Sequence, residues 1–142
     1  PNAINSSLKK LPIVKNMRWG NYDYSFVRPV HNLVVLYNDK VLCSNDNILG
    51  LKPTNYTYGH RIMGESKIIL DCSDNYSTLM LEHGKVIVNF ENRRKEIQEQ
   101  LNKKAQKLRL TINDMHGLLD EVTALVEYPI VLQGEFHPDY LE

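Results

Sequence analysis

The side chains best suited to binding in this sequence are arginines that stand close to aromatic residues. Arg18 precedes Trp19 in the motif MRWG, and Arg28 follows Phe26 in the motif FVRPVH. A guanidinium group pairs with phosphate through two parallel hydrogen bonds, and an aromatic ring can stack on a base. This combination favours nucleic acid as the ligand. The alternative is that the aromatic side chains belong to the core while the arginines bind backbone carbonyl groups.

A second segment with cations at both ends is rich in turn residues. Residues 50–61 read GLKPTNYTYGHR, so Lys52 lies near the beginning and His60 and Arg61 lie at the end. Loops of this kind often carry binding residues, although many only connect other elements. The candidate nucleic-acid contacts are therefore Arg18, Arg28, Lys52, His60 and Arg61.

The sequence contains no recognisable catalytic constellation. Its five histidines form neither an HxH nor an HExxH motif, and neither cysteine is close to one of them, so a zinc site is not expected. No phosphate-binding glycine loop and no GxSxG motif are present. Asp120 and Glu121 are adjacent, but neighbouring residues point about 100° apart on a helix, so we interpret them as a solvated or capping pair. We predict no catalytic and no metal-binding residue.

The composition is that of an ordinary globular chain, with 42% apolar and 24% charged residues among 142 positions, which suits one domain. No apolar run reaches the roughly 18 residues of a membrane span, and the beginning lacks the pattern of a signal peptide. Cys43 and Cys72, without a CxxC motif, favour reduced thiols in a cytoplasmic protein. We interpret Pro1 and Glu142 as the boundaries of a piece of a longer protein.

Charge is distributed unevenly along the chain. Residues 1–109 carry all 17 basic and 10 acidic side chains, a net +7, whereas residues 110–142 carry seven acidic and no basic ones, a net −7. The basic part would suit a surface that faces phosphates, and the acidic end would then be turned away from the phosphates or toward a basic partner. The alternative is that the two ends neutralise each other within the fold.

Hydrophobic periodicity predicts an α+β fold with short mixed or antiparallel strands and two main amphipathic helices. We expect one domain over residues 1–142, with an irregular lead-in at 1–16. Short β-rich runs predict strands at 31–37, 41–43, 48–51, 67–70, 85–90 and 130–132. The main helices are expected at 91–108 and 114–127, and a shorter helix, capped by Asp74, is expected to end before Gly84.

In its motifs and their order, the sequence resembles the β subunit of the bacterial heterotetrameric glycyl-tRNA synthetase. The matching stretches cover nearly the whole chain from about Leu11, at the family's spacing. They are MRWG at 17–20, FVRPVH at 26–31, GLK at 50–52, GHR at 59–61, GKVIVNFENRRKEI at 84–97 and LLDEVTALVEYPIVLQGEF at 118–136.

Two positions depart from the family's pattern. Asn32 stands where the family usually has an aromatic residue. The loop before GHR, which in the family tends to be richer in small residues and to carry an extra basic residue, contains Pro53, Tyr56 and Tyr58 here. A role that depends on that basic residue is not carried over to this chain.

The resemblance implies part of a class II, ATP-dependent ligase of α₂β₂ composition. Glycine would be activated with ATP and magnesium on the α subunit, whereas the large β subunit would supply tRNA recognition. This segment would belong to the N-terminal half of β, without a cofactor of its own. It is also more faintly similar to the β-rich accessory domains of the phenylalanine enzyme's large subunit. The implied partners are tRNA(Gly), the α subunit and the rest of β.

Three roles are open for such a segment. The first is support of tRNA recognition, by direct contact or as a scaffold. The second is an interface between subunits or β domains, for which the acidic end and the apolar face at 115–126 are suited. The third is editing of mischarged tRNA, which ranks last because a pocket for glycine can exclude every larger amino acid by size.

Overall fold

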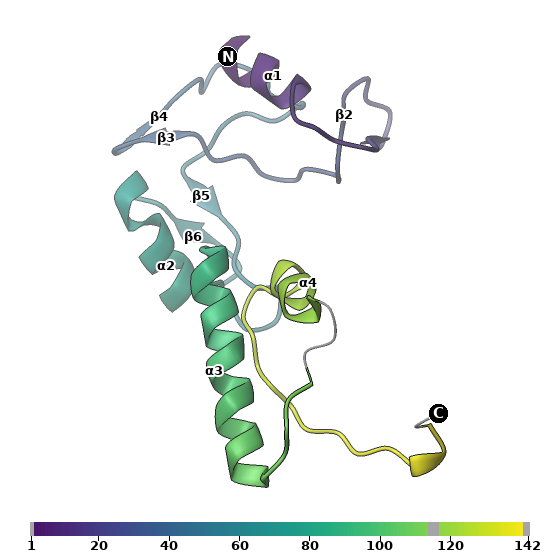
Figure 1. Ribbon diagram of the computed structural model, residues 1–142. Helices are drawn as coiled ribbons and strands as arrows, with labels where there is room; N and C mark the ends of the chain where they lie inside the picture. Colours follow the sequence, from purple (N-terminus) through teal and green to yellow (C-terminus); the bar gives the residue numbers. More distant parts are fainter. Residues whose placement is uncertain (1, 114–116, 141–142) are drawn as a thin grey trace. The chain divides into compact units, whose positions relative to one another are not determined.

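The computed structural model describes residues 2–113 and 117–140 (Figure 1). The chain consists of two compact units, residues 1–84 (the first unit) and residues 85–142 (the second unit). Helices and short antiparallel strand pairs are both present, which confirms the predicted α+β class. The single accessory domain over residues 1–142 stays a prediction.

Three two-stranded antiparallel sheets form the first unit together with short helices. In chain order its elements are α1 (Asn2–Lys9), β1 (Met17–Arg18), β2 (Ser25–Phe26), β3 (Leu36–Tyr37), β4 (Lys40–Val41), β5 (Tyr56–Thr57), β6 (Ile68–Ile69), the 3₁₀ helix η1 (Ser73–Asn75) and α2 (Tyr76–Glu82). The strands pair β1 with β2, β3 with β4, and β5 with β6. Asn38 has φ of 51° in the two-residue turn between β3 and β4, a backbone conformation that asparagine tolerates better than most residues.

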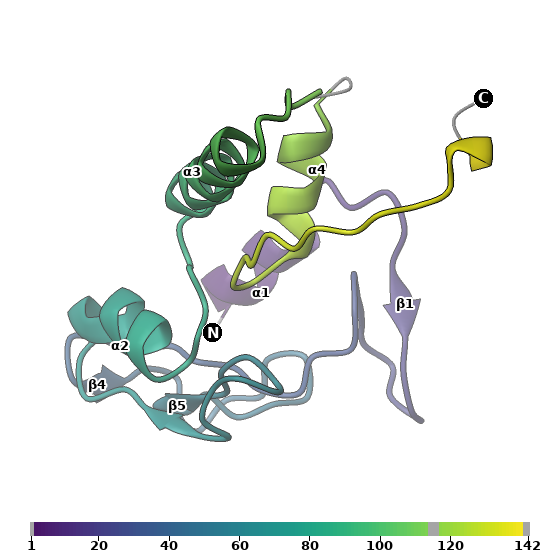
Figure 2. The same cartoon turned by 90° about the horizontal axis from the view of Figure 1, so that it is seen from below.

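The second unit is built on α3 (Phe90–Leu108), against which α4 (Leu118–Leu125) packs (Figures 1 and 2). The side chain of Asn89 caps α3 by accepting a hydrogen bond from the Asn92 amide, so the helix starts where a capping residue allows it. The segment after α4 runs back beside α3 and ends in η2 (Pro138–Tyr140).

Each unit has a small core. Ile48, Ile68, Leu70 and Met80 are buried in the first unit. Ile97, Leu119 and Thr123 are buried in the second, and burying one aliphatic side chain stabilises a fold by about 1.5–3 kcal/mol. Both cysteines are free and half-buried. Within the described residues, no helix has both the length and the apolar character of a membrane span.

Several local predictions in the first unit are wrong. Residues 1–16 are not irregular throughout, because they contain α1. The predicted strand 31–37 is reduced to β3 and an isolated bridge at Val34, and 48–51 is a turn closed by reciprocal hydrogen bonds between Ile48 and Leu51. Asp74 lies inside η1 and does not cap α2; Asp71 instead accepts hydrogen bonds from the Cys72 amide and the Asn75 side chain.

In the second unit, residues 85–90 and 130–132 are not strands. The Ile87 amide donates to the Glu127 carbonyl, and side chains of α3 bind other backbone groups of the two segments. The carbonyl groups of 87 and 88 accept hydrogen bonds from Arg93. Gln100 pairs with both the carbonyl of Pro129 and the amide of Val131, as a neighbouring strand would. Of the predicted helix 114–127, residues 114–116 lie outside the described residues, and α4 covers the central part. The helix predicted at 91–108 is confirmed as α3.

Candidate nucleic-acid interface

Arg18 lies in β1, paired in register with Ser25 of β2, and its side chain is exposed. The neighbouring Trp19 is half-buried and meets the edge of the Tyr24 ring, with 5.3 Å between the ring centroids. Tyr22 stacks on Tyr24 at 4.7 Å. Desolvation, together with the adjacent Tyr22 hydroxyl, raises the pKa of Tyr24, so this group stays neutral. Trp19 therefore packs within the fold, whereas Arg18 faces solvent.

The glycine of the GLK motif lies against Tyr24, which belongs to an aromatic cluster with Trp19 and Tyr22. A Cβ atom built on Gly50 would come within 2.2 Å of the Tyr24 ring, and the φ of Gly50 is +78°. Only glycine combines that conformation with so close an approach. Lys52 follows two residues later with an exposed side chain. Tertiary structure thus joins two motifs that are about thirty positions apart in the sequence.

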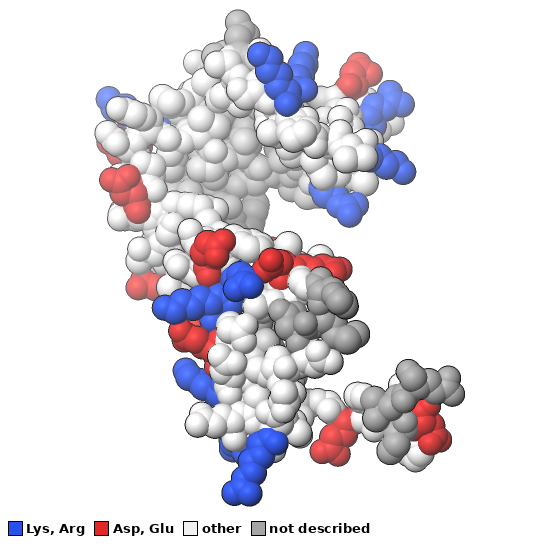
Figure 3. Space-filling model, viewed as in Figure 1, with Lys and Arg blue, Asp and Glu red and all other residues white. Residues whose placement is uncertain are grey.

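A cavity of about 630 Å³ opens beside Tyr24 and Gly50. Its lining combines apolar side chains such as Phe26 and Leu8 with polar ones such as Asn47. Figure 3 shows that the charged side chains over the part of the first unit with α1 and β2 are mostly Lys and Arg. This region has the character of a basic surface around a mixed polar and apolar hollow.

Arg28 follows β2 and Arg61 lies in a turn, and both side chains are exposed. Within residues 2–113 and 117–140, no ion pair, hydrogen bond or ring contact engages the side chain of Arg18, Arg28, Lys52 or Arg61. The alternative in which Arg28 and Arg61 bind carbonyl groups of their own fold therefore finds no contact in the part of the chain that the structure describes. With no partner among the described residues, each of these four side chains can meet an external anion.

His60 differs from the other four candidates because its ring is occupied within the chain. Its Nδ1 atom accepts hydrogen bonds from the backbone amides of Ile62 and Met63, both at 3.2 Å. The side chain is half-buried. The structure places His60 as the residue that holds the turn on which Arg61 stands.

The two departures from the family's pattern meet in space. Asn32 donates a hydrogen bond to the Tyr56 carbonyl at 2.7 Å and accepts one from Thr54 at 3.1 Å. The Lys67 ammonium lies 4.1 Å from the centroid of the Tyr56 ring, and the Tyr58 ring meets Tyr56 edge-on. The substituted loop is thus held to the strand region before it by polar contacts.

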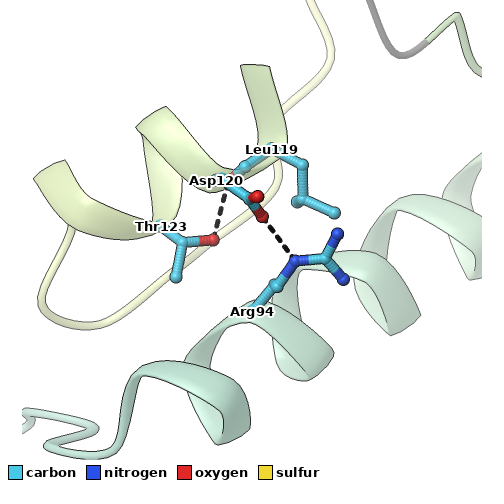
Figure 4. A network of polar contacts seen from close by, with 4 residues as sticks. All are labelled: Arg94, Leu119, Asp120 and Thr123. Atoms are coloured by element: carbon cyan, nitrogen blue, oxygen red, sulfur yellow. Dashed lines mark hydrogen bonds and ion pairs between the residues drawn. The ribbon is translucent and has the colours of Figure 1, made fainter. Parts of the chain in front are cut away.

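The second unit contains two arginines, Arg93 and Arg94, whose roles the sequence motifs did not indicate. Arg93 donates its Nε to the Thr123 carbonyl at 2.8 Å and its Nη1 to the Ile87 carbonyl. Arg94 forms an ion pair with Asp120, as Figure 4 shows, which partly neutralises the acidic end of the chain. The spacing of hydrophobic residues marks α3 but carries no signal for these carbonyl contacts, because it does not show which backbone groups a polar side chain binds; Thr123, for example, lies thirty positions after Arg93.

Basic side chains of the second unit also gather at the C-terminal end of α3, where the helix dipole favours them (Figure 3). Lys104 donates to the Val131 carbonyl at 3.0 Å, and Lys107 and Arg109 are exposed. Within residues 2–113 and 117–140, no three His, Cys, Asp or Glu side chains gather to hold a metal ion. The predicted absence of metal-binding and catalytic residues stays a prediction.

A family model of the glycyl-tRNA synthetase β subunit matches residues 1–142. The chain belongs to this family. It is 45% identical to the glycine–tRNA ligase β subunit of Neisseria meningitidis serogroup C over 99% of this chain and 20% of the relative. The corresponding subunit of Klebsiella pneumoniae is 44% identical over the same shares. The chain thus spans about a fifth of the length of the curated relatives it matches, and all five candidate residues lie within the matched stretch.

Proposed function

We propose that this chain is a non-catalytic part of a glycine–tRNA ligase β subunit that supports recognition of tRNA(Gly). In this proposal the α subunit activates glycine with ATP and magnesium, and the assembly works in the cytoplasm. The observation that carries the proposal is the exposure of Arg18, Arg28, Lys52 and Arg61, which have no partner within residues 2–113 and 117–140. The named activity of the relatives makes tRNA the polyanion to consider first.

Electrostatics explains why exposed, unpaired cations suit this role. A cation that already binds a carboxylate must give up that partner before it meets a phosphate, whereas a solvated cation loses only water and counterions. Release of counterions from the nucleic acid then favours association at low salt. Arginine adds a fork of donors that matches phosphate geometry. A few contacts of this kind orient the tRNA without chemistry on this part of the subunit.

The test compares arginines at the candidate surface with a cation elsewhere. Arg18→Ala and Arg61→Ala are made in the complete β subunit and assembled with the α subunit. Loss of a charge-assisted hydrogen bond costs about 1.5–3 kcal/mol, so kcat/KM for tRNA should fall about tenfold or more. Glycine-dependent pyrophosphate exchange and the melting temperature should not change. Lys95→Ala is the control, because Lys95 is 77% exposed on α3.

A melting temperature that falls together with charging would identify these arginines as scaffold. Unchanged charging in both variants would remove the contact role. The isolated chain should also hydrolyse no aminoacyl-tRNA, and deacylation above background in a purified sample would revive editing.

Exposed apolar residues support a second candidate function, an interface with other parts of the synthetase. Leu125 at the end of α4 is 74% exposed, and Leu132 in the following segment is 82% exposed. Side chains of this kind pair with partner surfaces more often than with phosphate. Leu125→Ser and Leu132→Ser should then weaken association with the α subunit while KM for tRNA in the assembled enzyme stays constant. Unchanged association would exclude these two residues from the interface.

A further inference from the structure

The motif GHR opens a turn whose two ends are bound to each other and to the end of α2. We name residues 59–65 the clamped turn. Gly59 donates to the Glu65 carbonyl at 3.2 Å, and Gly64 donates to the His60 carbonyl at 2.8 Å. The amide of His60 donates to the Gly84 carbonyl at 2.6 Å. The base of the turn is therefore fixed against the residues that follow α2.

Glycines make this attachment possible by letting backbones touch. A Cβ atom on Gly59 would lie 2.6 Å from the Cα atom of Gly84, and one on Gly64 would lie 2.3 Å from the Gly84 carbonyl oxygen. Real Cβ atoms do not approach other heavy atoms so closely, because the atoms would overlap. Any side chain at these positions would push the turn away from α2.

The imidazole of His60 fixes the upper part of the same turn. Its Nδ1 atom accepts the amides of Ile62 and Met63, which would otherwise need water or a ligand. Glu65, the sole carboxylate of residues 59–65, is hydrogen-bonded to Nδ1 of His83 at 2.8 Å, and its amide donates to the His83 carbonyl. Among the residues that the structure describes, Arg61 is the charged side chain of the clamped turn that has no partner.

The tip of the clamped turn presents a cation and apolar groups to solvent. Ile62 is 87% exposed and Met63 is 39% exposed, beside the exposed Arg61. A single exposed apolar side chain is common on protein surfaces. This one differs because the backbone amides of residues 59, 60 and 62–65 all donate hydrogen bonds, which lowers the entropy cost of ordering the turn when a partner binds.

Exposed apolar side chains next to a cation are suited to binding the ends and loops of RNA. Isoleucine and methionine side chains act as wedges at base steps in nucleic-acid complexes. Proteins read RNA chiefly where bases are unstacked, and arginine binds the phosphate beside them. The clamped turn offers these groups on neighbouring residues.

We propose that the clamped turn is a contact point for tRNA in which Ile62 and Met63 pack on an unstacked base or terminal base pair. Arg61 binds the adjoining phosphate. His60 is a positioning residue that holds the tip through Nδ1 and makes no contact with the tRNA. This inference rests on the proposed function and adds two apolar contacts to it.

The first experiment replaces Ile62 with alanine in the complete β subunit assembled with the α subunit. The expected rise in KM for tRNA is about tenfold, equivalent to about 1.4 kcal/mol of apolar contact. The slope of log KM against log salt should stay constant, because an apolar contact releases no counterion. Arg61→Ala should reduce that slope by about one. Ile69→Ala is the matched control, since Ile69 in β6 is 63% exposed and should leave KM unchanged.

The second experiment separates the two nitrogen atoms of His60. The Oδ1 atom of asparagine can take the place of Nδ1 as an acceptor, whereas the longer side chain of glutamine reaches the place of Nε2. If His60 holds the turn, His60→Asn should keep KM for tRNA near the native value and His60→Gln should raise it as His60→Ala does. The reverse order would show that His60 itself contacts the tRNA, and would overturn its positioning role.

The outcomes also separate this inference from the proposed function. If Arg18→Ala lowers kcat/KM for tRNA while Ile62→Ala changes nothing, the tip contact is wrong and the proposed function stands. If neither substitution changes charging, the proposed function fails with it. If Ile62→Ala weakens association with the α subunit and leaves KM for tRNA constant, the tip binds protein, and the RNA contact is overturned.

Discussion

Replacing Arg93 with methionine should destabilise the second unit, residues 85–142. The guanidinium group donates to the Thr123 carbonyl at 2.8 Å and to the Ile87 carbonyl, with a weaker contact to Val88 at 3.5 Å. Arg93 thereby ties the segment before α3 and the second half of α4 to the helix between them. Methionine keeps most of the aliphatic length but donates no hydrogen bond, so these carbonyl groups lose their partner.

The size of the effect follows from the two stronger bonds. A hydrogen bond with a charged donor contributes about 1.5–3 kcal/mol, so two of them contribute about 3–6 kcal/mol. Arg93 is half-buried, and competition from water favours the lower value of about 3 kcal/mol. A unit of fewer than 100 residues loses about 4–8 °C of melting temperature per kcal/mol. The second unit of Arg93→Met should therefore melt more than about 10 °C lower.

Two spectroscopic signals distinguish the units in one thermal scan. The helices α3 and α4 contain 19 and 8 residues, against 8 and 7 in α1 and α2, so far-ultraviolet circular dichroism reports mainly on the second unit. Trp19 is the single tryptophan of the chain and reports on the first unit. The substitution should shift the dichroism transition and leave the fluorescence transition in place.

Lys95→Met is the control on the same helix. Lys95 is 77% exposed and lies 3.8 Å from Glu99, a surface pair that contributes about 0.3–0.5 kcal/mol. Its melting curve should stay within about 4 °C of the native chain. Equal shifts for Arg93→Met and Lys95→Met, or a shift confined to the fluorescence transition, would refute the idea that carbonyl contacts of Arg93 hold this unit together.

Further outcomes can be measured on the same chain. Gly59→Ala should lower the melting temperature of the first unit, because the new Cβ would overlap Gly84, whereas Gly134→Ala should be neutral because nothing lies within 4 Å. The hydrogen bond from Asn75, with that from a backbone amide, lowers the pKa of Asp71 below its usual 3.8. Ionised Asp71 therefore stabilises the fold at any pH above the usual carboxyl pKa, and this stabilisation is lost as the pH falls through the lowered pKa. Asp71→Asn should reduce the acid sensitivity of the fluorescence transition. Binding of tRNA by the isolated chain should be weak and fall steeply with salt, and tight binding unaffected by salt would contradict a phosphate-based contact. The chain alone should form no glycyl adenylate in a pyrophosphate exchange assay.

The sequence predicted correctly those elements that depend on residues within a few positions of one another. The apolar stripe of 91–108 predicts α3 because residues three and four apart share a helix face, and Asn89 supplies its cap. The Asn38-Asp39 turn and the strand near Ile68 are likewise visible in the sequence, because turn preference and β-branching act within a few residues. The ordered motifs also indicated the family, which the comparison with relatives confirms.

Tertiary contacts determined the conformation of two segments whose composition predicted strands. Residues 85–90 and 130–132 have the composition of strands but pair with no strand. Side chains of Arg93, Gln100 and Lys104, together with the backbone carbonyl of Glu127, bind carbonyl and amide groups of these segments instead. A composition that favours extended backbone cannot show which partner will complete the hydrogen bonds. Gln100 and Lys104 lie about thirty positions before the groups that they bind, and Glu127 lies forty positions after Ile87.

At the candidate site too, some features can be read from the sequence and others depend on tertiary contacts. The sequence alone placed Arg18, Arg28, Lys52 and Arg61 among residues suited to phosphate, because charge and neighbouring residue types can be read directly. It could not show that the fold occupies the ring of His60 or that Ile62 stands exposed at the tip of the turn. The turn that carries Ile62 is also joined to Gly84, twenty-five positions after Gly59, and only the folded chain brings these two glycines together.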